Sequence, residues 1–264
     1  MTELKHLQSV ILSIAKDIDK LCQENDIQYY LLGGSAIGAI RHKGFIPWDD
    51  DLDIIMDNEN YEKFIQVCKE QLDKEKYYLQ IGLEDWPLYF SKVKLKGTVL
   101  EEYEAYATND DMKGIYVDIF KMDNISSNPI VARWQYFCGK YYLCYQLSQR
   151  TYKSASFKKR LMIALALPCK IPVIRNFFKY QVEKYNGKEC DYLGFMYGRT
   201  KFRSGIINKR LFGKPTYVQF EDTKLPVAEH YHEYLTQVFG NYMQLPPENQ
   251  RVGLHFIKVD FGKY

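Results

Sequence analysis

The chain has 264 residues, 46% of them hydrophobic and 26% charged, with a formal net charge of +3 at pH 7. These values are typical of a folded globular protein with one large domain, or of a domain that carries a sizeable insertion. Acids and lysines among the apolar positions of residues 1–23 exclude a signal peptide, and no apolar run approaches the roughly 18 residues of a transmembrane helix.

The cysteines show no C-x-x-C pair and have no nearby histidine at the spacing of a zinc site. We therefore expect free thiols, as in a reducing cytoplasm. The six residues concerned are Cys22, Cys68, Cys138, Cys144, Cys169 and Cys190.

Helix and strand patterns alternate through the first half of the chain. Apolar residues recur at three- and four-residue steps over 4–21, which predicts an amphipathic first helix. Further helices are predicted over 35–42, capped by Ser35, and over 58–72, capped by Asn58. β-Branched and aromatic residues predict strands over 27–34, 51–56, 77–82, 89–96, 97–103 and 114–120. Because these elements are mixed and the middle strands have hairpin-like spacing, we predict an α+β (mixed α/β) fold whose sheet is mixed rather than purely parallel.

The composition changes abruptly after the last of these strands. Residues 124–182 contain ten Lys or Arg, no Asp or Glu, and eleven aromatic residues. We predict a basic helical insertion, in which Pro168 and Pro172 interrupt the apolar run. The chain is thereby divided into a catalytic core over 1–123, the insertion over 124–194, and a C-terminal part over 195–264 with a last helix over 227–240.

The basic insertion needs an anionic partner or a solvated surface. Apolar helix residues flanked by lysines and arginines over 153–180 favour an anionic membrane surface. Nucleic acid is not expected as a partner, because no nucleic-acid-binding motif accompanies the charge. The alternative is a helical subdomain that packs its apolar face on the core and leaves its cations in water.

Four aspartates, at positions 49, 50, 51 and 53, lie directly before an apolar run. Residues i and i+2 of a strand face the same way, so Asp51 and Asp53 are expected to point together. Asp118 interrupts an otherwise apolar strand, where a charge needs a partner, and three carboxylates converge if the two strands are neighbours. Such a cluster suits Mg²⁺ or Mn²⁺. An EF-hand is excluded because Ile54 stands where that loop needs glycine.

The stretch before the aspartates favours phosphate. Gly33, Gly34 and Ser35 stand between a strand and a helix, where backbone N–H groups and a hydroxyl meet a helix N-terminus. Arg41 and Lys43 follow and are candidates to hold a diphosphate. Taken alone, the GGS stretch is explained by an ordinary glycine turn, and the run of aspartates by an exposed acidic turn. In this order, the pieces indicate a metal and phosphate site for phosphoryl transfer.

With those residues in view, the stretch GGSAIGAIRHKGFIPWDDDLDI over 33–54 resembles the LicD family nearly residue for residue. The resemblance continues through KVKLKGT, GIYVDIFKMD and LPVAEHYHEYLTQVFGNYMQLPP. It implies a nucleotidyltransferase-like mixed sheet flanked by helices, with the basic insertion and a C-terminal helix added. It also implies metal-dependent transfer of a phospho-alcohol, typically phosphocholine, from a CDP-alcohol such as CDP-choline to a sugar hydroxyl. The acceptor would be a lipid-linked precursor of a cell-surface polysaccharide, teichoic acid or lipopolysaccharide.

The resemblance also implies roles for particular residues. The donor-phosphate loop matches Gly33, Gly34 and Ser35, and Lys92 and Lys94 stand where the family has a basic pair on a strand. The catalytic and metal-binding carboxylates match Asp51, Asp53 and Asp118. Arg251 and His255 resemble a terminal basic pair that would close over the donor.

A choline group would need aromatic faces around its quaternary ammonium. Trp48, Trp86 and Tyr89 are the candidates, because they flank proline turns near the expected site. The alternative is that these three rings only pack in the core.

Together these patterns predict a transferase of LicD type that is cytoplasmic and peripheral on the inner face of the membrane. Two other readings remain open. One is a nucleotidyltransferase that attaches a nucleoside monophosphate to an acceptor and releases pyrophosphate. The other is a non-catalytic, membrane-associated scaffold that keeps the fold, which the intact set of carboxylates argues against because unneeded buried charges cost stability.

Overall fold

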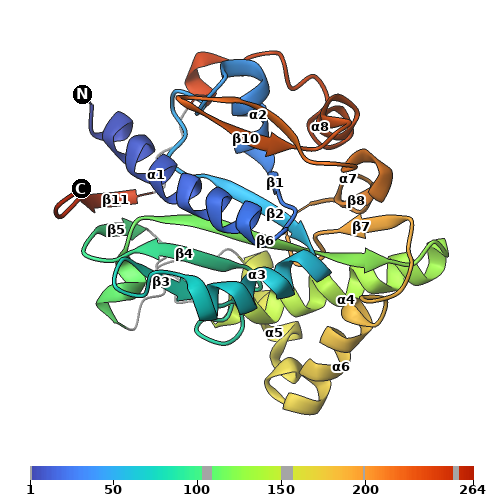
Figure 1. The fold of residues 1–264 in the computed structure, drawn as a ribbon. Helices are drawn as coiled ribbons and strands as arrows, with labels where there is room; N and C mark the ends of the chain where they lie inside the picture. The colour runs from blue at the N-terminus through green and yellow to red at the C-terminus, as the bar shows by residue number, and fades with distance from the viewer. Residues whose placement is uncertain (1, 103–108, 150–156, 199, 252–255) are drawn as a thin grey trace.

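The computed structural model describes residues 2–102, 109–149, 157–198, 200–251 and 256–264. Its centre is a mixed sheet in which β2 and β6 run parallel and the other neighbours pair antiparallel (Figure 1). The predicted α+β fold with a mixed sheet is therefore confirmed. In spatial order the strands are β1 (Tyr30–Leu31), β2 (Asp53–Asp57), β6 (Tyr116–Ile125), β4 (Ser91–Leu95) and β3 (Tyr77–Gln80).

Further strands extend this sheet and flank it. The far end of β6 pairs with β7 (Tyr192–Gly194), which pairs in turn with β8 (Ile206–Asn208). Two separate two-stranded antiparallel sheets are formed by β9 (Thr216–Phe220) with β10 (Thr223–Val227), which are a hairpin, and by β5 (Val99–Glu102) with β11 (Phe256–Asp260), which are far apart in the sequence.

The first helix, α1 (Glu3–Glu24), lies across the sheet and packs against β4 and β6 (Figure 1). Thr2 caps it by accepting a hydrogen bond from the Lys5 N–H, and its buried stripe includes Leu7 and Ile14. The other helices are α2 (Gly33–His42), α3 (Asn58–Gln71), α4 (Pro129–Ser148), α5 (Phe157–Leu165), α6 (Pro172–Glu183), α7 (Phe202–Gly205) and α8 (Tyr231–Phe239). Single turns of 3-10 helix are η1 (Asp110–Lys113), η2 (Leu167–Lys170), η3 (Lys209–Leu211) and η4 (Glu248–Gln250).

Helix α3 covers one face of the central sheet, so the polar side chains of the candidate site must lie on the opposite face. The Tyr61 hydroxyl of α3 lies 2.6 Å from the Ser91 hydroxyl of β4, and Ser91 pairs with Ile119 of β6. Since side chains alternate along a strand, Ile119 points toward α3 while Asp118 points to the opposite face.

Both cap expectations were wrong. Helix α2 begins at Gly33 after Leu32, and the Ser35 hydroxyl accepts a hydrogen bond from the Asp53 N–H at 2.9 Å instead of capping the helix. Helix α3 is capped by Asp57, one residue before the predicted Asn58. Helix α2 therefore begins without a side-chain cap, whereas at α3 a one-residue shift supplies the acceptor that the helix end requires.

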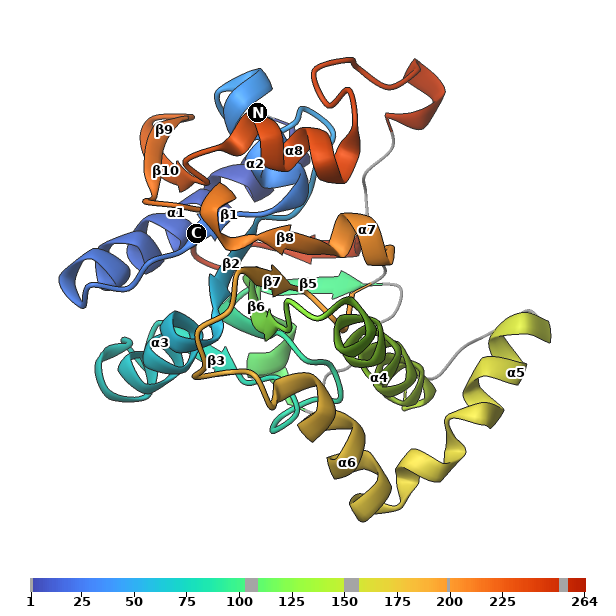
Figure 2. The same ribbon diagram turned by 90° about the vertical axis from the view of Figure 1, so that its right-hand side faces the viewer.

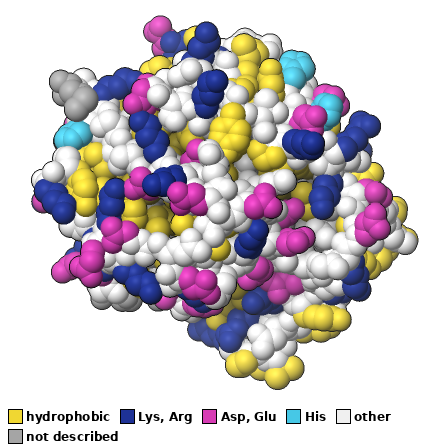
Figure 3. Space-filling model, in the orientation of Figure 1, with side chains coloured by type: hydrophobic (Ala, Val, Ile, Leu, Met, Phe, Trp, Pro, Cys, Tyr) yellow, Lys and Arg dark blue, Asp and Glu magenta, His cyan; other side chains and the backbone are white. Residues whose placement is uncertain are grey.

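The basic segment forms α4, α5 and α6, as predicted for a helical insertion. Helices α4 and α6 pack together over a second apolar cluster that includes Cys138, Tyr142 and Val182. Helices α5 and α6 project from the body of the molecule (Figure 2). Many of their apolar side chains are exposed, and apolar atoms gather at this end of the surface (Figure 3). Within the described part of the chain, no helix is both long and apolar enough to cross a membrane.

Candidate active site

A row of three charged side chains crosses three neighbouring strands of the sheet. Asp53 of β2 pairs in register with Asp118 of β6, and Asp118 pairs in register with Lys92 of β4. The Lys92 ammonium lies 3.0 Å from Asp118 Oδ1. The register therefore places two carboxylates and one ammonium side by side on the face opposite α3.

Burial makes this row electrostatically costly. Desolvation, followed by the charges of Asp51 and Asp118, raises the pKa of Asp53 well above its usual value. Burial also raises the pKa of Asp118 to about 6, although the Lys92 ammonium opposes this shift. One oxygen of Asp53, Oδ1, is buried and has no hydrogen-bond partner among the described residues. The site thus concentrates negative charge where protein groups do not neutralise it fully.

A second lysine, Lys94, lies on the same face one step along β4. Both lysines are buried, and their ammonium groups lie 3.2 Å (Lys92) and 4.5 Å (Lys94) from the centroid of the Tyr116 ring. Burial, with the nearby Lys92 charge, lowers the pKa of Lys94 to about 7. These ammonium groups are suited to meet phosphate oxygens only if the donor reaches this face of the sheet.

The acidic run lies beside the glycine loop. The described carboxylates of Asp49, Asp50 and Asp51 each offer an oxygen, and these oxygens lie within 4.8 Å of one another. Gly34 lets Asp49 approach, because a Cβ at this position would stand 2.7 Å from Asp49 Oδ2 and would displace that side chain. Gly33 has a φ of +57°, a conformation that favours glycine.

These carboxylates fit a divalent cation. The unpartnered Asp53 Oδ1 and the raised pKa of Asp53 both indicate negative charge that a cation would offset. Hard carboxylate oxygens are the ligands that Mg²⁺ and Mn²⁺ prefer. The structure brings Asp53 and Asp118 together in register and places Asp51 near Asp53, but Asp51 also belongs to the cluster with Asp49 and Asp50. Strand β2 begins at Asp53 rather than at Asp51, although the ladder extends to Leu52, whose carbonyl accepts from the Asp118 N–H.

The candidate phosphate-binding residues do not all gather at this row. Gly33, Gly34 and Ser35 lie at its edge, through the Ser35–Asp53 hydrogen bond. Arg41 and Lys43 lie at the other end of α2, about 10 Å along the helix axis from Gly34. The Arg41 guanidinium donates to the backbone carbonyl of Tyr242 at 2.6 Å, so it holds the C-terminal part of the chain.

The three candidate choline rings are also separated. Trp86 is buried, donates its indole N–H to the Phe90 carbonyl, and lies 5.4 Å from the Lys92 ammonium. Trp48 lies beside the acidic run, and the Arg251 guanidinium stands 5.6 Å from its ring centroid. Tyr89 stacks on Tyr197 and lines a separate cavity. Arg251 is thus near the acidic run, whereas His255 lies outside the described residues.

Two further polar residues belong to the row, and the sequence analysis missed them. Tyr116 donates its hydroxyl to Glu102 at 2.7 Å, and Glu102 lies 4.0 Å from the Lys92 ammonium. Tyr116 stands two residues before Asp118 on the same strand, so the alternation of side chains was sufficient to predict that both lie on the same face. Glu102 had no such signal, because its strand β5 lies outside the main sheet.

Comparison with known proteins gives consistent results. The family model described as LicD/FKTN/FKRP, nucleotidyltransferase domain, matches residues 26–158. The lipopolysaccharide cholinephosphotransferase LicD of Haemophilus influenzae is 30% identical over an alignment of 264 positions, which covers 96% of this chain and 96% of that protein. An uncharacterized protein of Rickettsia typhi is 43% identical over 54 residues, which cover 20% of this chain and 18% of that protein.

Proposed function

The chain belongs to the LicD/FKTN/FKRP nucleotidyltransferase family, and from this premise we propose that it is a transferase that moves phosphocholine onto a sugar hydroxyl. The donor would be CDP-choline, and the acceptor a precursor of a cell-surface polysaccharide. The similarity to the Haemophilus influenzae cholinephosphotransferase over nearly the full length of both chains supports phosphocholine as the transferred group.

The observation that carries the proposal is the row formed by Asp53, Asp118 and Lys92. A fold that needed only stability would not align two carboxylates on adjacent buried strands, because like charges in a desolvated place destabilise it. Phosphoryl transfer needs such a row, since it depends on positioning and on stabilising charge around phosphorus.

We propose Asp51, Asp53 and Asp118 as the residues that would hold Mg²⁺ or Mn²⁺. A bound divalent ion would supply charge stabilisation for the donor diphosphate. The chain's own residues have separate tasks. Lys92 and Lys94 would bind phosphate oxygens, and Asp118, which a bound divalent ion would keep ionised, would orient the attacking hydroxyl.

A lipid-linked acceptor would bring the enzyme to a membrane. We propose that the insertion provides this contact, because its exposed apolar residues are accompanied by cations. Leu161 of α5 and Val173 of α6 are 50% and 78% exposed, and Arg160 and Lys170 are exposed nearby. This combination suits an anionic lipid surface.

The test is a donor panel. Purified protein is incubated with Mg²⁺ and CDP-choline, CDP-ethanolamine, CDP-glycerol, CDP-ribitol, CTP or ATP, and its melting temperature is measured. Turnover is measured as CMP release after addition of a membrane extract. A stabilising shift and CMP release with CDP-choline, both lost in Asp53→Asn, are expected. A response confined to a free triphosphate would replace the proposal with a nucleotidyltransferase, and no response to any donor would favour a scaffold.

A further inference from the structure

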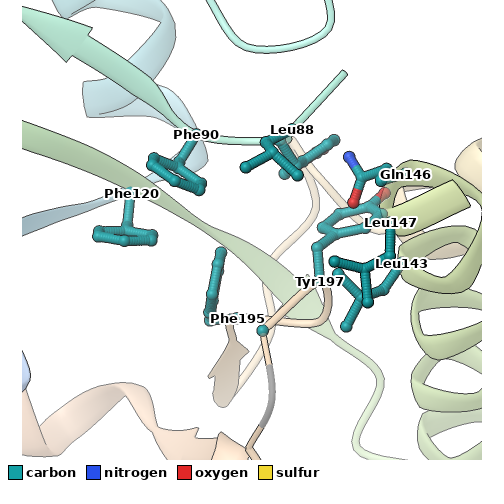
Figure 4. Close-up of a pocket in the computed structure, with 10 residues that line it drawn as sticks. Leu88, Phe90, Phe120, Leu143, Gln146, Leu147, Phe195 and Tyr197 are labelled. Atoms are coloured by element: carbon teal, nitrogen blue, oxygen red, sulfur yellow. The ribbon is translucent and has the colours of Figure 1, made fainter. Parts of the chain in front are cut away.

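A small cavity lies on the same face of the sheet as the Asp118–Lys92 pair. It has a volume of roughly 190 Å³ and lies between the sheet, helix α4 and the segment after β7 (Figure 4). A cavity of about 150 Å³ suffices for benzene, whereas drug-sized ligands occupy roughly 300 Å³ or more. The size therefore fits one compact group of a ligand, not a whole nucleotide.

The wall of this cavity is aromatic. Phe90 stacks on Phe120 with ring centroids 4.6 Å apart, and Phe195 meets Phe120 edge to face at 5.1 Å. Tyr89 and Tyr197 stack at 3.5 Å and complete the aromatic side. Figure 4 shows the phenylalanine rings on one side and residues of α4 on the other. Ring faces carry negative charge density, so such a wall attracts a cation that has no hydrogen to donate.

One polar group in the wall lacks a partner. Gln146 of α4 lines the cavity and is 1% exposed, yet neither atom of its side-chain amide has a hydrogen-bond partner among the described residues. A buried amide without a partner costs stability. Its carbonyl oxygen is suited to face a positively charged group.

The charges behind the aromatic wall also favour a cation. The Tyr89 hydroxyl donates to Glu183, and Lys121, whose ammonium lies 4.8 Å from the Tyr89 ring centroid, is held by Glu183 at 3.5 Å and Asp123 at 3.9 Å. Glu62 also pairs with Lys121, and Lys179 pairs with Glu183, so this group of three ionised carboxylates and two ammonium groups has a net charge of −1.

The cavity lies within reach of the transfer site. Phe120 follows Asp118 by two residues on β6, which is about 6.6 Å along the strand on the same face. On β4, the Lys92 ammonium lies 3.0 Å from Asp118 and 5.6 Å from the Phe90 ring centroid. In phosphocholine, one oxygen and two methylene carbons separate the phosphorus from the nitrogen. A phosphorus atom at the Asp118–Lys92 pair would therefore place the nitrogen at this wall.

We propose that this cavity binds the trimethylammonium group of the donor, and this inference rests on the proposed phosphocholine transfer. Tyr89 is then the one residue of the three choline candidates that belongs to the pocket. Phe90, Phe120 and Phe195 replace the two tryptophans as its aromatic faces.

The experiment distinguishes recognition of the ligand's positive charge from recognition of its shape. Dissociation constants are measured by calorimetry for CDP-choline and for its neutral carbon analogue, in which a tert-butyl group replaces the trimethylammonium group. The wild-type protein is compared with Phe195→Leu and with Phe178→Leu, a matched control whose ring packs on the same apolar cluster but does not line the cavity. Each variant is first checked by thermal melting. CMP release from CDP-choline is measured separately, after addition of a membrane extract that supplies the acceptor.

We expect wild type and Phe178→Leu to prefer CDP-choline over the neutral analogue, and Phe195→Leu to weaken CDP-choline binding about five- to thirtyfold while hardly changing the analogue. Equal losses for both ligands would overturn the cation site and indicate an apolar group as the occupant. A wild type that binds both ligands equally, or that binds neither, would also overturn it.

A second variant keeps the test decisive if Phe195→Leu does not fold. Gln146→Leu removes the unpartnered amide, so it should fold at least as stably as wild type and still lose preference for CDP-choline. An unchanged preference would count against the cavity. If the protein prefers CDP-choline but releases no CMP, the cavity binds a cation and the proposed phosphocholine transfer is wrong. If CMP is released but neither variant changes binding, the transfer is supported and this cavity is not the choline site.

Discussion

Asp53 and Asp118 are direct partners on two parallel strands, β2 and β6, so their carboxylates emerge side by side from the same face of the sheet. Strand β6 has apolar, fully buried neighbours on either side of Asp118, Val117 and Ile119, and these fix its register. The hydrophobic core thereby holds two like charges together. This arrangement opposes stability and indicates selection for function.

The first prediction concerns Asp53→Asn. Removing one charge from the pair relieves repulsion and leaves the packing intact, so the melting temperature should stay equal or rise. CMP release should fall by about a hundredfold or more, because a candidate metal ligand is lost. The exposed Asp222→Asn, which removes an ion pair with Lys16, is the matched control and should retain activity. A lower melting temperature for Asp53→Asn, at wild-type activity, would contradict a functional role.

Metal binding should depend on the paired strands. Mg²⁺ or Mn²⁺ should raise the melting temperature of the wild-type protein, and a chelator should reverse the shift. The shift should vanish in Asp118→Asn, whose carboxylate faces Asp53 across the sheet. If Asp50→Asn abolished the shift and Asp118→Asn preserved it, the cluster of Asp49, Asp50 and Asp51 would be the metal site instead.

The ion pair between Lys92 and Asp118 gives a stability prediction. Lys92→Met leaves Asp118 buried without its ammonium partner, which should lower the free energy of unfolding by about 3–5 kcal/mol. The double variant Lys92→Met with Asp118→Leu should recover part of that loss, because the carboxylate nearest to Lys92 is removed as well, while Glu102 still loses its ion pair with Lys92. Urea unfolding of the two single variants and the double variant measures the coupling. Additive losses would show that the two side chains stabilise the fold independently.

Much of this site could be predicted from the sequence, because strand alternation is a local property. The pattern around Asp53 and around Asp118 placed each carboxylate on a strand face, and the structure shows these strands as neighbours. The positions of Arg41 and Tyr89 could not be predicted. Each depends on a distant partner, the Tyr242 carbonyl in one case and Tyr197 in the other.

The aromatic cavity had no local signal either. Its residues come from the segment before β4, from β6, from α4 and from the segment after β7, so no spacing rule connects them. The prediction of a cap at Ser35 failed for a similar reason, since its hydroxyl accepts a hydrogen bond from the Asp53 N–H of β2. Local patterns predicted elements and faces, whereas contacts between distant segments decided which polar groups meet.

A buried carboxylate gives a pH prediction. Burial raises the pKa of Asp123 from its usual 3.8 to about 6, against the opposing charge of Lys121. A raised carboxylate pKa contributes stability that is fully present below pH 3.8 and is lost as the pH rises through about 6. Asp123→Asn keeps an acceptor for Asn186, so the variant should gain stability relative to wild type by roughly 3 kcal/mol between pH 4 and pH 7. Urea unfolding at several pH values in this window measures the difference, and parallel curves for the two proteins would contradict the shift.

The last prediction concerns membrane contact by the insertion. Val173 and Phe177 of α6 are 78% and 49% exposed, and burying such side chains in lipid stabilises the bound state. Serine at both positions should lower co-sedimentation with anionic vesicles at least about tenfold. Charge reversal in Lys170→Glu should weaken binding by a further factor of about thirty, since it changes the charge by two units and each unit near such a surface contributes about 1 kcal/mol.

The control for these variants is Ile257→Ser on β11, where a 56% exposed apolar side chain lies outside the insertion. This variant should bind vesicles as the wild type does, and binding of the wild type should fall with ionic strength and on neutral lipid. Co-sedimentation that ignores lipid charge and salt, or that falls equally in Ile257→Ser, would show that the cations of the insertion are only solvated. In that case α6 would serve to cover the second apolar cluster, and a membrane-bound acceptor would have to be brought to the enzyme by another surface.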